Sequence, residues 1–543
     1  MRLSLCEKVN LTMKRILSTV LCGLATMNVA VQAAHDEGER PRLVVGIVVD
    51  QLRTDYIEFL QSYFTDRGFK RLMKDGAYIR DIDFKVKGLD AATATAMLYT
   101  GAYPANTGVA SESVYDPVTR KMQPALLDSK TLGNFTNDSY SPENLRLSTL
   151  SDELAVDGLA LSSIYSFAAD PQLAVIMTGH AGTGACWINE NTGNWATTTY
   201  YKNLPAPVSA RNYSYSVASR IDTMQWKPSI PIEKFPGLPQ QKKIYPFRHM
   251  FPRSDKEVYR RFSASPVGNA EVTDVAIECL KQMKIGSNGN AVDMINVGYT
   301  LAPYKYVSDG DFRAELTDAY LRLDSQLGRL FEAIDKYVGA GNAVIWLSST
   351  GYYDDAVIDD KKYRIPTGEF SMKRAESLLN SYLSALHGNA DYVVAFRGSH
   401  LYLDHSLLEE KKLDVSDVVA DARSFLARMS GVSDAFTLYD ILSPRTPEQE
   451  RLRLSVDPKK GGDIFVTFNP GWAVVDDLDY PVTSHPVRET PVLTPAFIVA
   501  PGIVPQKISL PVDATALAPT VSSILRIRSP NGAVSKPLLL ERH

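Results

Sequence analysis

The sequence of 543 residues predicts an α/β fold, in which helices sandwich a parallel sheet that is interrupted by a β-rich inserted segment. Three observations predict it. Residues 43–49 and 343–347 are continuous apolar runs, typical of strands covered on both faces. Residues 274–350 read as helix, strand, helix and strand, which implies crossovers between parallel strands. Residues 161–265 instead carry short β-like runs with many Pro, Tyr and Asn residues.

Composition limits the possible partners. Hydrophobic residues make up 45% of the chain and charged residues 22%, as in an ordinary globular protein. The formal net charge is -4 and no Lys/Arg-rich tract stands out, which argues against nucleic acid as a partner. No segment after the N-terminal one is apolar enough to span a bilayer, so we expect no integral membrane protein.

Residues 1–34 are predicted to be a secretory signal. Lys14 and Arg15 precede the apolar run 16–34, and small residues allow cleavage near Ala33. The alternative is a transmembrane anchor, for which the run is about long enough, although two amide side chains weaken it. We therefore expect an exported, periplasmic protein. Two cysteines remain after cleavage, Cys186 and Cys279, and they either form a disulfide or stay as separate thiols.

The first strand after the signal ends in a carboxylate. The run 43–49 leads into Asp50, and helical spacing follows it. In an open α/β sheet, ligands and metals sit at this edge. Asp50 is therefore either a helix N-cap or a metal ligand.

The next element is a helix that begins among small residues at 91–96 and stops at Gly101 and Pro104. A helix N-terminus offers unpaired N–H groups and the positive end of a dipole, which suits an oxyanion. Thr93 and Thr95 either serve such a site or cap the helix.

The second half of the chain returns to α/β order. A long helix over 315–339 precedes the strand 343–347, which ends in the small polar stretch 348–351 with no carboxylate or imidazole. A final strand and helix follow from about residue 494. We predict an α/β core of residues 41–160 and 266–540, with 161–265 inserted as a cap segment in the same domain.

Together these stretches resemble the alkaline phosphatase superfamily, in its nucleotide pyrophosphatase/phosphodiesterase-like branch. The phosphate-irrepressible type of secreted bacterial alkaline phosphatase is the most similar. The resemblance covers roughly Pro41 to Leu540 in the family's order. The matching stretches are LVVGIVVDQLRTDYI, MLYTGAYPANTGV, TGHAGTGACWINENTGNWATTTYY, DAYLRLDSQLGRLFEAID, PAFIVAPGI and DATALAPTVSSIL.

The resemblance implies a specific chemistry. Family members bind two zinc ions and attack phosphate with a Thr or Ser at a helix N-terminus. Each zinc takes about three ligands from Asp and His side chains. The position of the family's nucleophile falls on Ala91, which has no hydroxyl. The family's phosphate-holding Lys and Arg fall near Asp170 and Gln172, and Asp170 would repel a phosphate.

Two of the six zinc-ligand positions keep a ligand, and four do not. Asp50 and His485 are retained, and they would serve different zinc ions. The positions that have lost their ligands are Gly298, Ala302, Ser349 and Thr350. Because a single carboxylate or imidazole does not hold zinc against water, we expect no cofactor.

These positions lead to two hypotheses about function. The first is a protein that has lost dizinc phosphatase catalysis and acts as a binding or scaffold protein, with an unknown small ligand or envelope protein as its partner. Its ligand crevice would be formed by Asp50, Ser349, Thr350 and His485. The alternative is a metal-dependent hydrolase of phosphate monoesters or diesters with a rearranged site. That site would use Thr93 or Thr95 as nucleophile, and the side chains that would support it are Asp354, Asp355, His180 and His400.

Overall fold

The computed structural model describes residues 40–116, 119–308, 310–354, 367–478, 483–487 and 492–542. Contacts divide the chain into two units, Met1–Arg40 and Pro41–His543, and the second holds every helix and strand described below. Among the helices of the described residues, none combines the length and apolar character needed to cross a bilayer.

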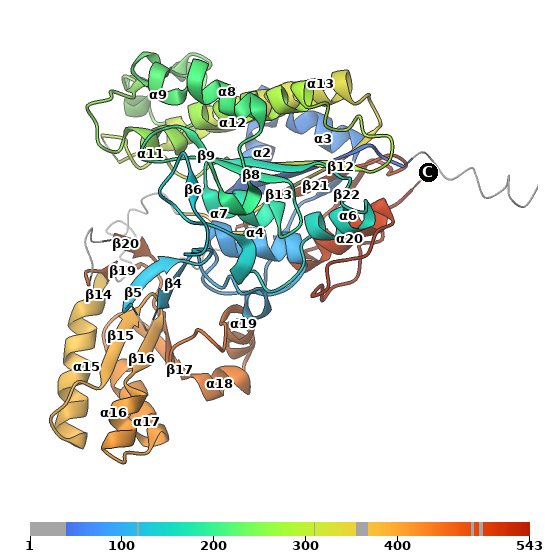
Figure 1. Cartoon of the computed structure of the whole chain (residues 1–543). Helices are drawn as coiled ribbons and strands as arrows, with labels where there is room; N and C mark the ends of the chain where they lie inside the picture. Colours follow the sequence, from blue (N-terminus) through green and yellow to red (C-terminus); the bar gives the residue numbers. More distant parts are fainter. Residues whose placement is uncertain are drawn as a thin grey trace, which may run out of the picture. The chain divides into compact units, whose positions relative to one another are not determined.

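A ten-stranded mixed sheet forms the centre of this unit (Figure 1). In spatial order its strands are β22 (Gln506–Ile508), β2 (Ala77–Ile79), β21 (Ala496–Val499), β13 (Ala343–Ser349), β1 (Leu43–Asp50), β12 (Asp293–Thr300), β7 (Ile164–Ala168), β8 (Gly184–Ile188), β9 (Trp195–Thr198) and β6 (Gly133–Asn134). The predicted α/β fold is confirmed. The five strands from β13 to β8 are parallel, whereas β21 and β9 run antiparallel to their neighbours.

The antiparallel flank at β9 has a local cause. A turn at residues 189–194 joins β8 to β9, in which the Gly193 N–H donates to the Asn189 carbonyl at 2.8 Å and Gly193 has a φ of 68°. A connection this short permits only antiparallel pairing, because parallel strands need a long crossover. The sheet is therefore mixed at its flanks and parallel at its centre, where the candidate site lies.

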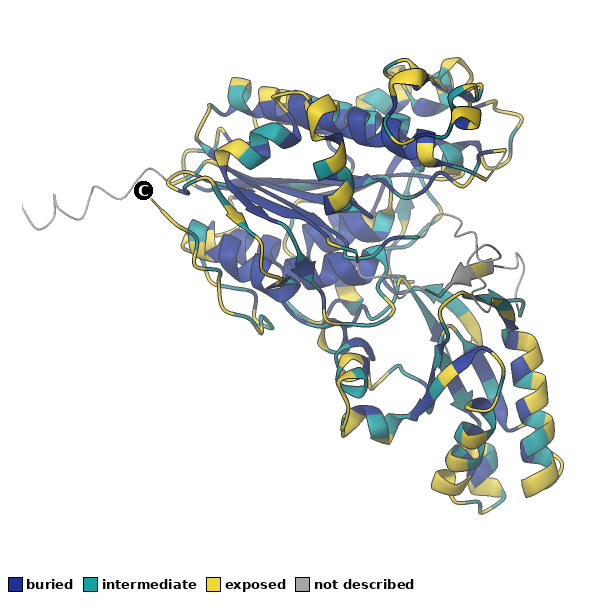
Figure 2. Ribbon diagram, turned by 180° about the vertical axis from the view of Figure 1, so that it is seen from behind, coloured by how far each residue is buried: buried dark blue, intermediate teal, exposed yellow. Residues whose placement is uncertain are grey.

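Alternate residues of β1 face the two helical layers, as the strand period of two requires. Leu43 and Val45 pack with one layer, while Val44 and Val48 pack with the other. The first layer contains α2 (Thr54–Leu60), α3 (Phe69–Asp75), α12 (Pro266–Gln282) and α13 (Arg313–Tyr337). The second contains α4 (Ala91–Thr100), α6 (Leu150–Asp157), α7 (Pro171–Thr178) and α20 (Leu517–Leu525). Buried residues accordingly fill the central strands (Figure 2).

The segment 161–265 divides between two structures. Its first part supplies β7, α7, β8 and β9 to the central sheet and the helical layers. Its later part is mainly helical, with α8 (Ala206–Ser214), α9 (Val217–Arg220), α10 (Gln240–Lys243), α11 (Val258–Ser263) and the short pair β10 (Gln225–Trp226) and β11 (His249–Met250). As a domain division, 161–265 against 41–160 and 266–540 stays a prediction.

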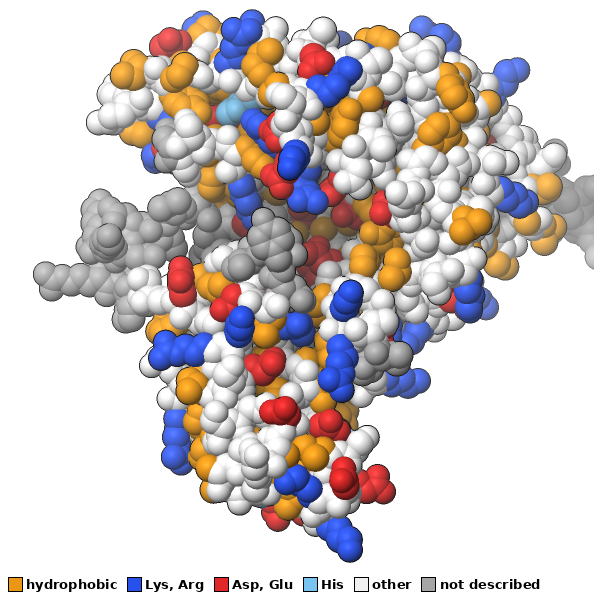
Figure 3. Space-filling model, turned by 60° about the vertical axis from the view of Figure 1, so that its left-hand side comes forward, with side chains coloured by type: hydrophobic (Ala, Val, Ile, Leu, Met, Phe, Trp, Pro, Cys, Tyr) orange, Lys and Arg blue, Asp and Glu red, His pale blue; other side chains and the backbone are white. Residues whose placement is uncertain are grey.

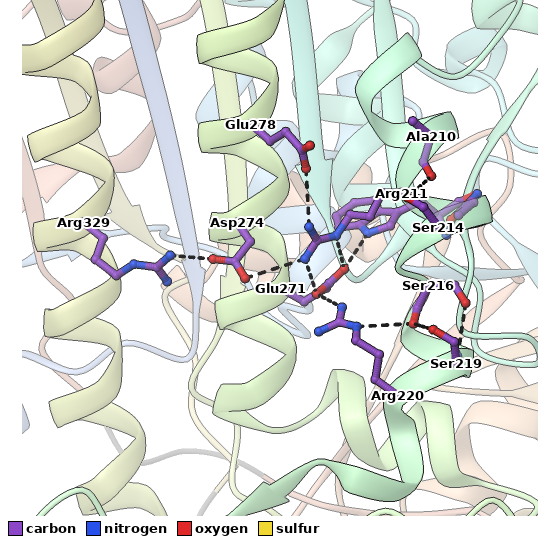
Figure 4. Close-up of polar contacts among 12 residues, drawn as sticks. Ala210, Arg211, Ser214, Ser216, Ser219, Arg220, Glu271, Asp274, Glu278 and Arg329 are labelled. Carbon is purple, nitrogen blue, oxygen red and sulfur yellow. Dashed lines mark hydrogen bonds and ion pairs between the residues drawn. The ribbon is translucent and has the colours of Figure 1, made fainter.

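Ion pairs attach the helical part of this segment to α12. Glu271 of α12 is 3% exposed and accepts from Arg211 at 2.7 and 2.8 Å and from Arg220 at 2.5 Å (Figure 4). The indole N–H of Trp195 donates to the same carboxylate at 3.2 Å. The two guanidinium groups hold the pKa of Glu271 below its ordinary value despite burial, which alone would raise it.

Residues 367–478 and 483–487 form smaller sheets beside the central one. One sheet has the order β15 (Val393–Arg397), β16 (His400–Leu403), β18 (Ile464–Phe468) and β17 (Val432–Thr437), and the other has β14 (Gly368–Ser371), β19 (Trp472–Asp476) and β20 (Thr483–Pro486). The helices here are α15 (Met372–His387), α16 (His405–Glu410), α17 (Val415–Leu426), α18 (Leu438–Leu442) and α19 (Pro447–Ser455). Most of these elements share a separate hydrophobic cluster, while α18 and α19 bury a smaller one with Phe436 of β17.

The two cysteines that follow the predicted signal are separate. Cys186 of β8 and Cys279 of α12 are both buried free thiols. Burial raises the pKa of each thiol well above its ordinary value.

Candidate functional site

The carboxyl ends of β13, β1 and β12 meet at one edge of the sheet. The register places Asp50 beside Thr300 of β12, and Val49 beside Ser349 of β13. The Thr350 hydroxyl, just past β13, donates to Asp50 Oδ1 at 2.9 Å. The structure therefore brings Asp50, Ser349 and Thr350 together, as the sequence predicts.

Asp50 has two hydroxyl donors. Besides Thr350, the phenol of Tyr352 hydrogen-bonds to the carboxylate. Burial nevertheless raises the pKa of Asp50 to about 6, because desolvation outweighs these two hydrogen bonds, and the nearby carboxylates of Asp354 and Asp170 raise it further. This site can therefore hold a proton near neutral pH.

The Thr350 hydroxyl already makes two hydrogen bonds within the protein. It accepts from the backbone N–H of Gln51 at 2.9 Å while it donates to Asp50. Gln51 is 3% exposed and has a left-handed φ of 61°, a costly conformation for a residue with a side chain. Ser349 donates to the Leu52 carbonyl at 2.7 Å. Ser349 and Thr350 have no exposed surface, so they join strand ends and do not line a crevice.

Asp354 reaches back to the end of β1, but it contacts Gln51. Its backbone N–H donates to Gln51 Oε1 at 2.8 Å, and its carboxylate accepts from Gln51 Nε2 at 3.3 Å. Lys305 lies 3.7 Å from the same carboxylate. Asp355 lies outside the described residues.

The N-terminus of α4 has the predicted position but lacks an accessible hydroxyl. Ala91 is its first residue, and the N-cap Asp90 accepts from the Thr93 N–H at 2.8 Å. The Thr95 hydroxyl is buried and donates to the Ala91 carbonyl at 2.6 Å, which is a helical back-bond. The Thr93 hydroxyl is 1% exposed and has no hydrogen-bond partner among the described residues.

The first position of the first lost ligand pair leaves no space for a side chain. A Cβ built on Gly298 would lie 2.8 Å from the Ala168 Cβ and 3.3 Å from the Met177 Cε. Ala302, the second position of the pair, directs its N–H to the Thr300 hydroxyl at 3.1 Å. A carboxylate at position 298 is therefore excluded by the packing of β7 and α7 against β12.

The positions to which the resemblance assigns the family's phosphate clamp hold one acidic and one amide side chain, and both make structural hydrogen bonds. Asp170 caps α7 by accepting from the Leu173 N–H at 2.9 Å. Desolvation, with a further contribution from Glu190 and Asp90, raises the pKa of Asp170 to about 6, although the residue keeps exposed surface. Gln172 donates to the Glu112 carbonyl at 3.0 Å and accepts from a backbone N–H. Figure 3 shows acidic side chains in the depth of a hollow on one face, with Lys and Arg side chains at its rim. An ionised carboxylate at position 170 opposes a phosphate dianion.

The histidines contribute less than the sequence allowed. The backbone of His485 pairs with Val474 in β20, and its side chain lies outside the described part of the structure. His180 hydrogen-bonds to Asp152 at 3.0 Å and to the Leu145 carbonyl at 2.8 Å, which ties α6 to α7. His400 is enclosed in the β16 sheet, where desolvation lowers its pKa to about 4.

As the resemblance aligns them, these residues do not fit the family's two-zinc centre in its usual form. Four of the six positions it assigns hold Gly298, Ala302, Ser349 and Thr350, which lack a zinc-binding group, and Gly298 has no room for a side chain. Within the described residues, no three His, Cys, Asp or Glu side chains are grouped closely enough to hold a metal ion.

The fold and the strand-end site define a phosphoester hydrolase fold of the alkaline phosphatase superfamily. The chain belongs to the family described as type I phosphodiesterase / nucleotide pyrophosphatase, whose sequence model matches residues 44–491. It is 27% identical to the alkaline phosphatase PafA of Elizabethkingia meningoseptica over 523 residues, which cover 92% of this chain and 94% of that protein.

It is also 25% identical to the alkaline phosphatase PhoV of Synechococcus elongatus, with 92% of each chain covered. The crystal structure of wild-type alkaline phosphatase PafA superposes with a TM-score of 0.79 at 26% identity and covers 93% of this chain and 99% of that one. The fold implied by the resemblance is thereby confirmed.

The expectation of no cofactor is contradicted by this membership. Enzymes of the family, including the alkaline phosphatases to which the chain is similar, depend on zinc. The expectation came from counting ligand positions one at a time, and such a count does not decide what a chain of this family binds.

Two residues of the site were missed from the sequence. Tyr352 donates to Asp50, and Gln51, the next residue in the chain, joins Thr350 and Asp354. The left-handed Gly351, with a φ of 78°, turns the chain after β13 and so precedes Tyr352 directly. The stretch STGYY carried that signal, because a Gly after a strand predicts such a turn.

Proposed function

We propose that this family member has lost the phosphoryl-transfer reaction of the alkaline phosphatases and acts as an exported binding or scaffold protein. The single observation that carries the proposal is Ala91. This residue opens α4 where the family places its nucleophile, and a methyl group cannot form a phosphoenzyme. The loss of the phosphoenzyme step holds whatever metal the chain carries, because a metal ion activates a side-chain hydroxyl but does not supply one.

The acidic surroundings support the same proposal. The family's phosphate clamp is replaced by the exposed Asp170 and by Gln172, which is engaged with backbone groups. A phosphate ester would therefore meet a carboxylate where the family offers two cations. The proposed ligand crevice comprises Asp50 and His485, with the buried Ser349 and Thr350 at the strand end beside Asp50, and its occupant is a small ligand or an envelope protein.

One observation favours the alternative, a metal-dependent hydrolase of phosphate monoesters or diesters. The Thr93 hydroxyl lies in the first turn of α4, two residues past Ala91, and no described residue hydrogen-bonds to it. A shift in the start of this helix would be needed to present it, since the residue is 1% exposed.

A turnover assay separates the two functions. The full chain, equilibrated with zinc, is assayed with an aryl phosphate monoester and a diester, and bound zinc is measured per chain. We expect no turnover above the rate without protein. Zinc-dependent turnover that Thr93→Ala abolishes and Thr95→Ala preserves would establish the alternative. Turnover that neither substitution changes would also refute the loss of the reaction.

Export is part of the proposal and rests on the signal-like segment 1–34. The N-terminal sequence of the chain recovered from the cell envelope is expected to begin next to Ala33. Recovery of a chain that still begins at residue 1 or at Met13 would contradict cleavage.

A further inference from the structure

A loop at the amino-terminal ends of the parallel strands exposes apolar side chains. The candidate site lies at the opposite, carboxyl-terminal ends of these strands. Val156, Leu159 and Leu161 are 63%, 82% and 57% exposed, all within six residues at the end of α6. We call residues 156–161 the apolar loop. Scattered exposed leucines need no explanation, but three such residues in one loop form a local patch.

The backbone of the apolar loop is strained. Leu159 and Ala160 have left-handed φ values of 50° and 61°. Such a conformation costs about 1–2 kcal/mol for each residue with a side chain. Hydrogen bonds from the Ala160 N–H to the Ala155 carbonyl and from the Leu161 N–H to the Gly158 carbonyl, both 2.9 Å, hold the turn. The chain thus maintains an unfavourable turn that presents leucines to solvent, which points to a function outside the fold itself.

The apolar loop lies beside the start of β1. Asn288 donates to the Leu161 carbonyl at 2.8 Å, and the Ser163 N–H donates to Asp293 at 2.8 Å. The Asp293 N–H in turn donates to the Arg42 carbonyl at 3.1 Å. The folded unit therefore begins at the edge that carries the loop.

The charged residues of this edge complement an anionic surface. Arg42 and Lys284 are exposed cations on loops of the same edge, and Asp157 of α6 is the opposing charge inside the apolar loop. Lys284 begins the turn to Gly286, whose N–H donates to Asp293 at 2.8 Å. Exposed leucines flanked by Lys and Arg are the composition that binds the interface of an anionic bilayer.

We propose that the apolar loop docks on the surface of an anionic phospholipid bilayer, with Leu159 and Leu161 entering the headgroup region and Arg42 and Lys284 facing lipid phosphates. This role is independent of the chemistry at the strand ends, which lie at the opposite edge of the sheet. It would place the crevice of Asp50 away from the membrane and open to solution.

Site-specific fluorescence of the full chain tests the proposal. Leu159→Trp adds a probe at the most exposed position of the loop, and the unmodified protein supplies the background of the native tryptophans. The matched control is Leu510→Trp, because Leu510 is 78% exposed and lies between β22 and β23 (Val512–Asp513) at the opposite sheet edge. Vesicles of phosphatidylglycerol and phosphatidylethanolamine are compared with the same vesicles carrying brominated acyl chains.

We expect brominated lipid to reduce the added emission of Leu159→Trp about twofold, because interfacial side chains reach the acyl boundary. The emission of Leu510→Trp should not change. Equal quenching of both probes, or of neither, would overturn the proposal, and Leu161→Trp repeats the test at a second position. If sedimentation shows a dimer that the double substitution Leu159→Ser and Leu161→Ser dissociates, the loop contacts a second copy and the lipid proposal is wrong.

Discussion

Packing around Gly298 gives the sharpest quantitative prediction. This residue lies in β12, where the family carries a zinc-binding carboxylate. A methyl group added to Gly298 would meet the Ala168 Cβ at 2.8 Å, which is closer than real Cβ atoms approach. Ala168 is fixed in β7, so the strand backbone has to move, while the Met177 Cε at 3.3 Å belongs to a flexible side chain. Overpacking of this kind costs about 1–3 kcal/mol.

Gly298→Ala should therefore lower the free energy of unfolding by about 1–3 kcal/mol. Gly298→Asp should lower it further, because it also buries a carboxylate. Urea unfolding followed by circular dichroism measures both. Gly289→Ala is the matched control, since no atom of the described residues lies within 4 Å of a Cβ there, and it should change stability by less than about 0.5 kcal/mol. If Gly298→Ala costs no more than this control, the claim that packing excludes the ligand fails.

Buried charges lead to further predictions about stability. Because burial raises the pKa of Asp50 to about 6 from an ordinary 3.8, the folded chain holds this proton more tightly than the unfolded chain, and that stabilisation is lost as the pH rises from about 4 to about 6. Asp50→Asn should raise the free energy of unfolding by about 1–3 kcal/mol at pH 7.5 and leave it almost unchanged at pH 4. Urea unfolding in the presence of EDTA measures both values. An equal effect at the two pH values would refute the raised pKa of Asp50. Glu271→Gln removes the carboxylate that pairs with Arg211 and should lower the free energy of unfolding by about 3–5 kcal/mol. Glu190→Gln is the control, because its partner Arg260 is exposed, and it should lower the free energy of unfolding by less than about 1 kcal/mol. Similar losses of stability for the two variants in thermal unfolding would count against a buried network.

The central strands could be predicted because their signal is local. Continuous apolar runs bounded by polar residues identify β1 and β13, and the helices between the later strands require parallel crossovers. The antiparallel flanks could not be predicted this way, because the pairing of β21 depends on contacts between residues far apart in the chain. The separate sheets of residues 367–487 were missed for the same reason. The short strands β17 and β18 pair with each other, and this pairing forms only when the chain folds.

The positions of the candidate-site residues at the ends of strands and helices could be predicted, but the hydrogen bonds between them could not. Resemblance to a family located Asp50, Ala91 and Thr350 correctly with respect to the strand and helix ends. No pattern in the sequence showed that Thr350 would donate to Asp50 or that Thr95 would bond back to its own helix, since a hydroxyl has several possible partners.

The hydrogen bonds of Asp50 explain how a family ligand persists where its neighbours have changed. In the family this carboxylate faces a metal cation, and here it accepts from the hydroxyls of Thr350 and Tyr352. Thr350 stands at the position of a lost metal-binding His and also accepts from Gln51, so the substituted residue now links β1 to the end of β13. Replacing Asp50 by a residue without a side-chain oxygen would leave the Thr350 and Tyr352 hydroxyls without their acceptor, a cost in stability that exists whether or not the protein is a catalyst. The presence of Asp50 therefore does not argue for a surviving reaction, and the decision rests on the missing hydroxyl at Ala91.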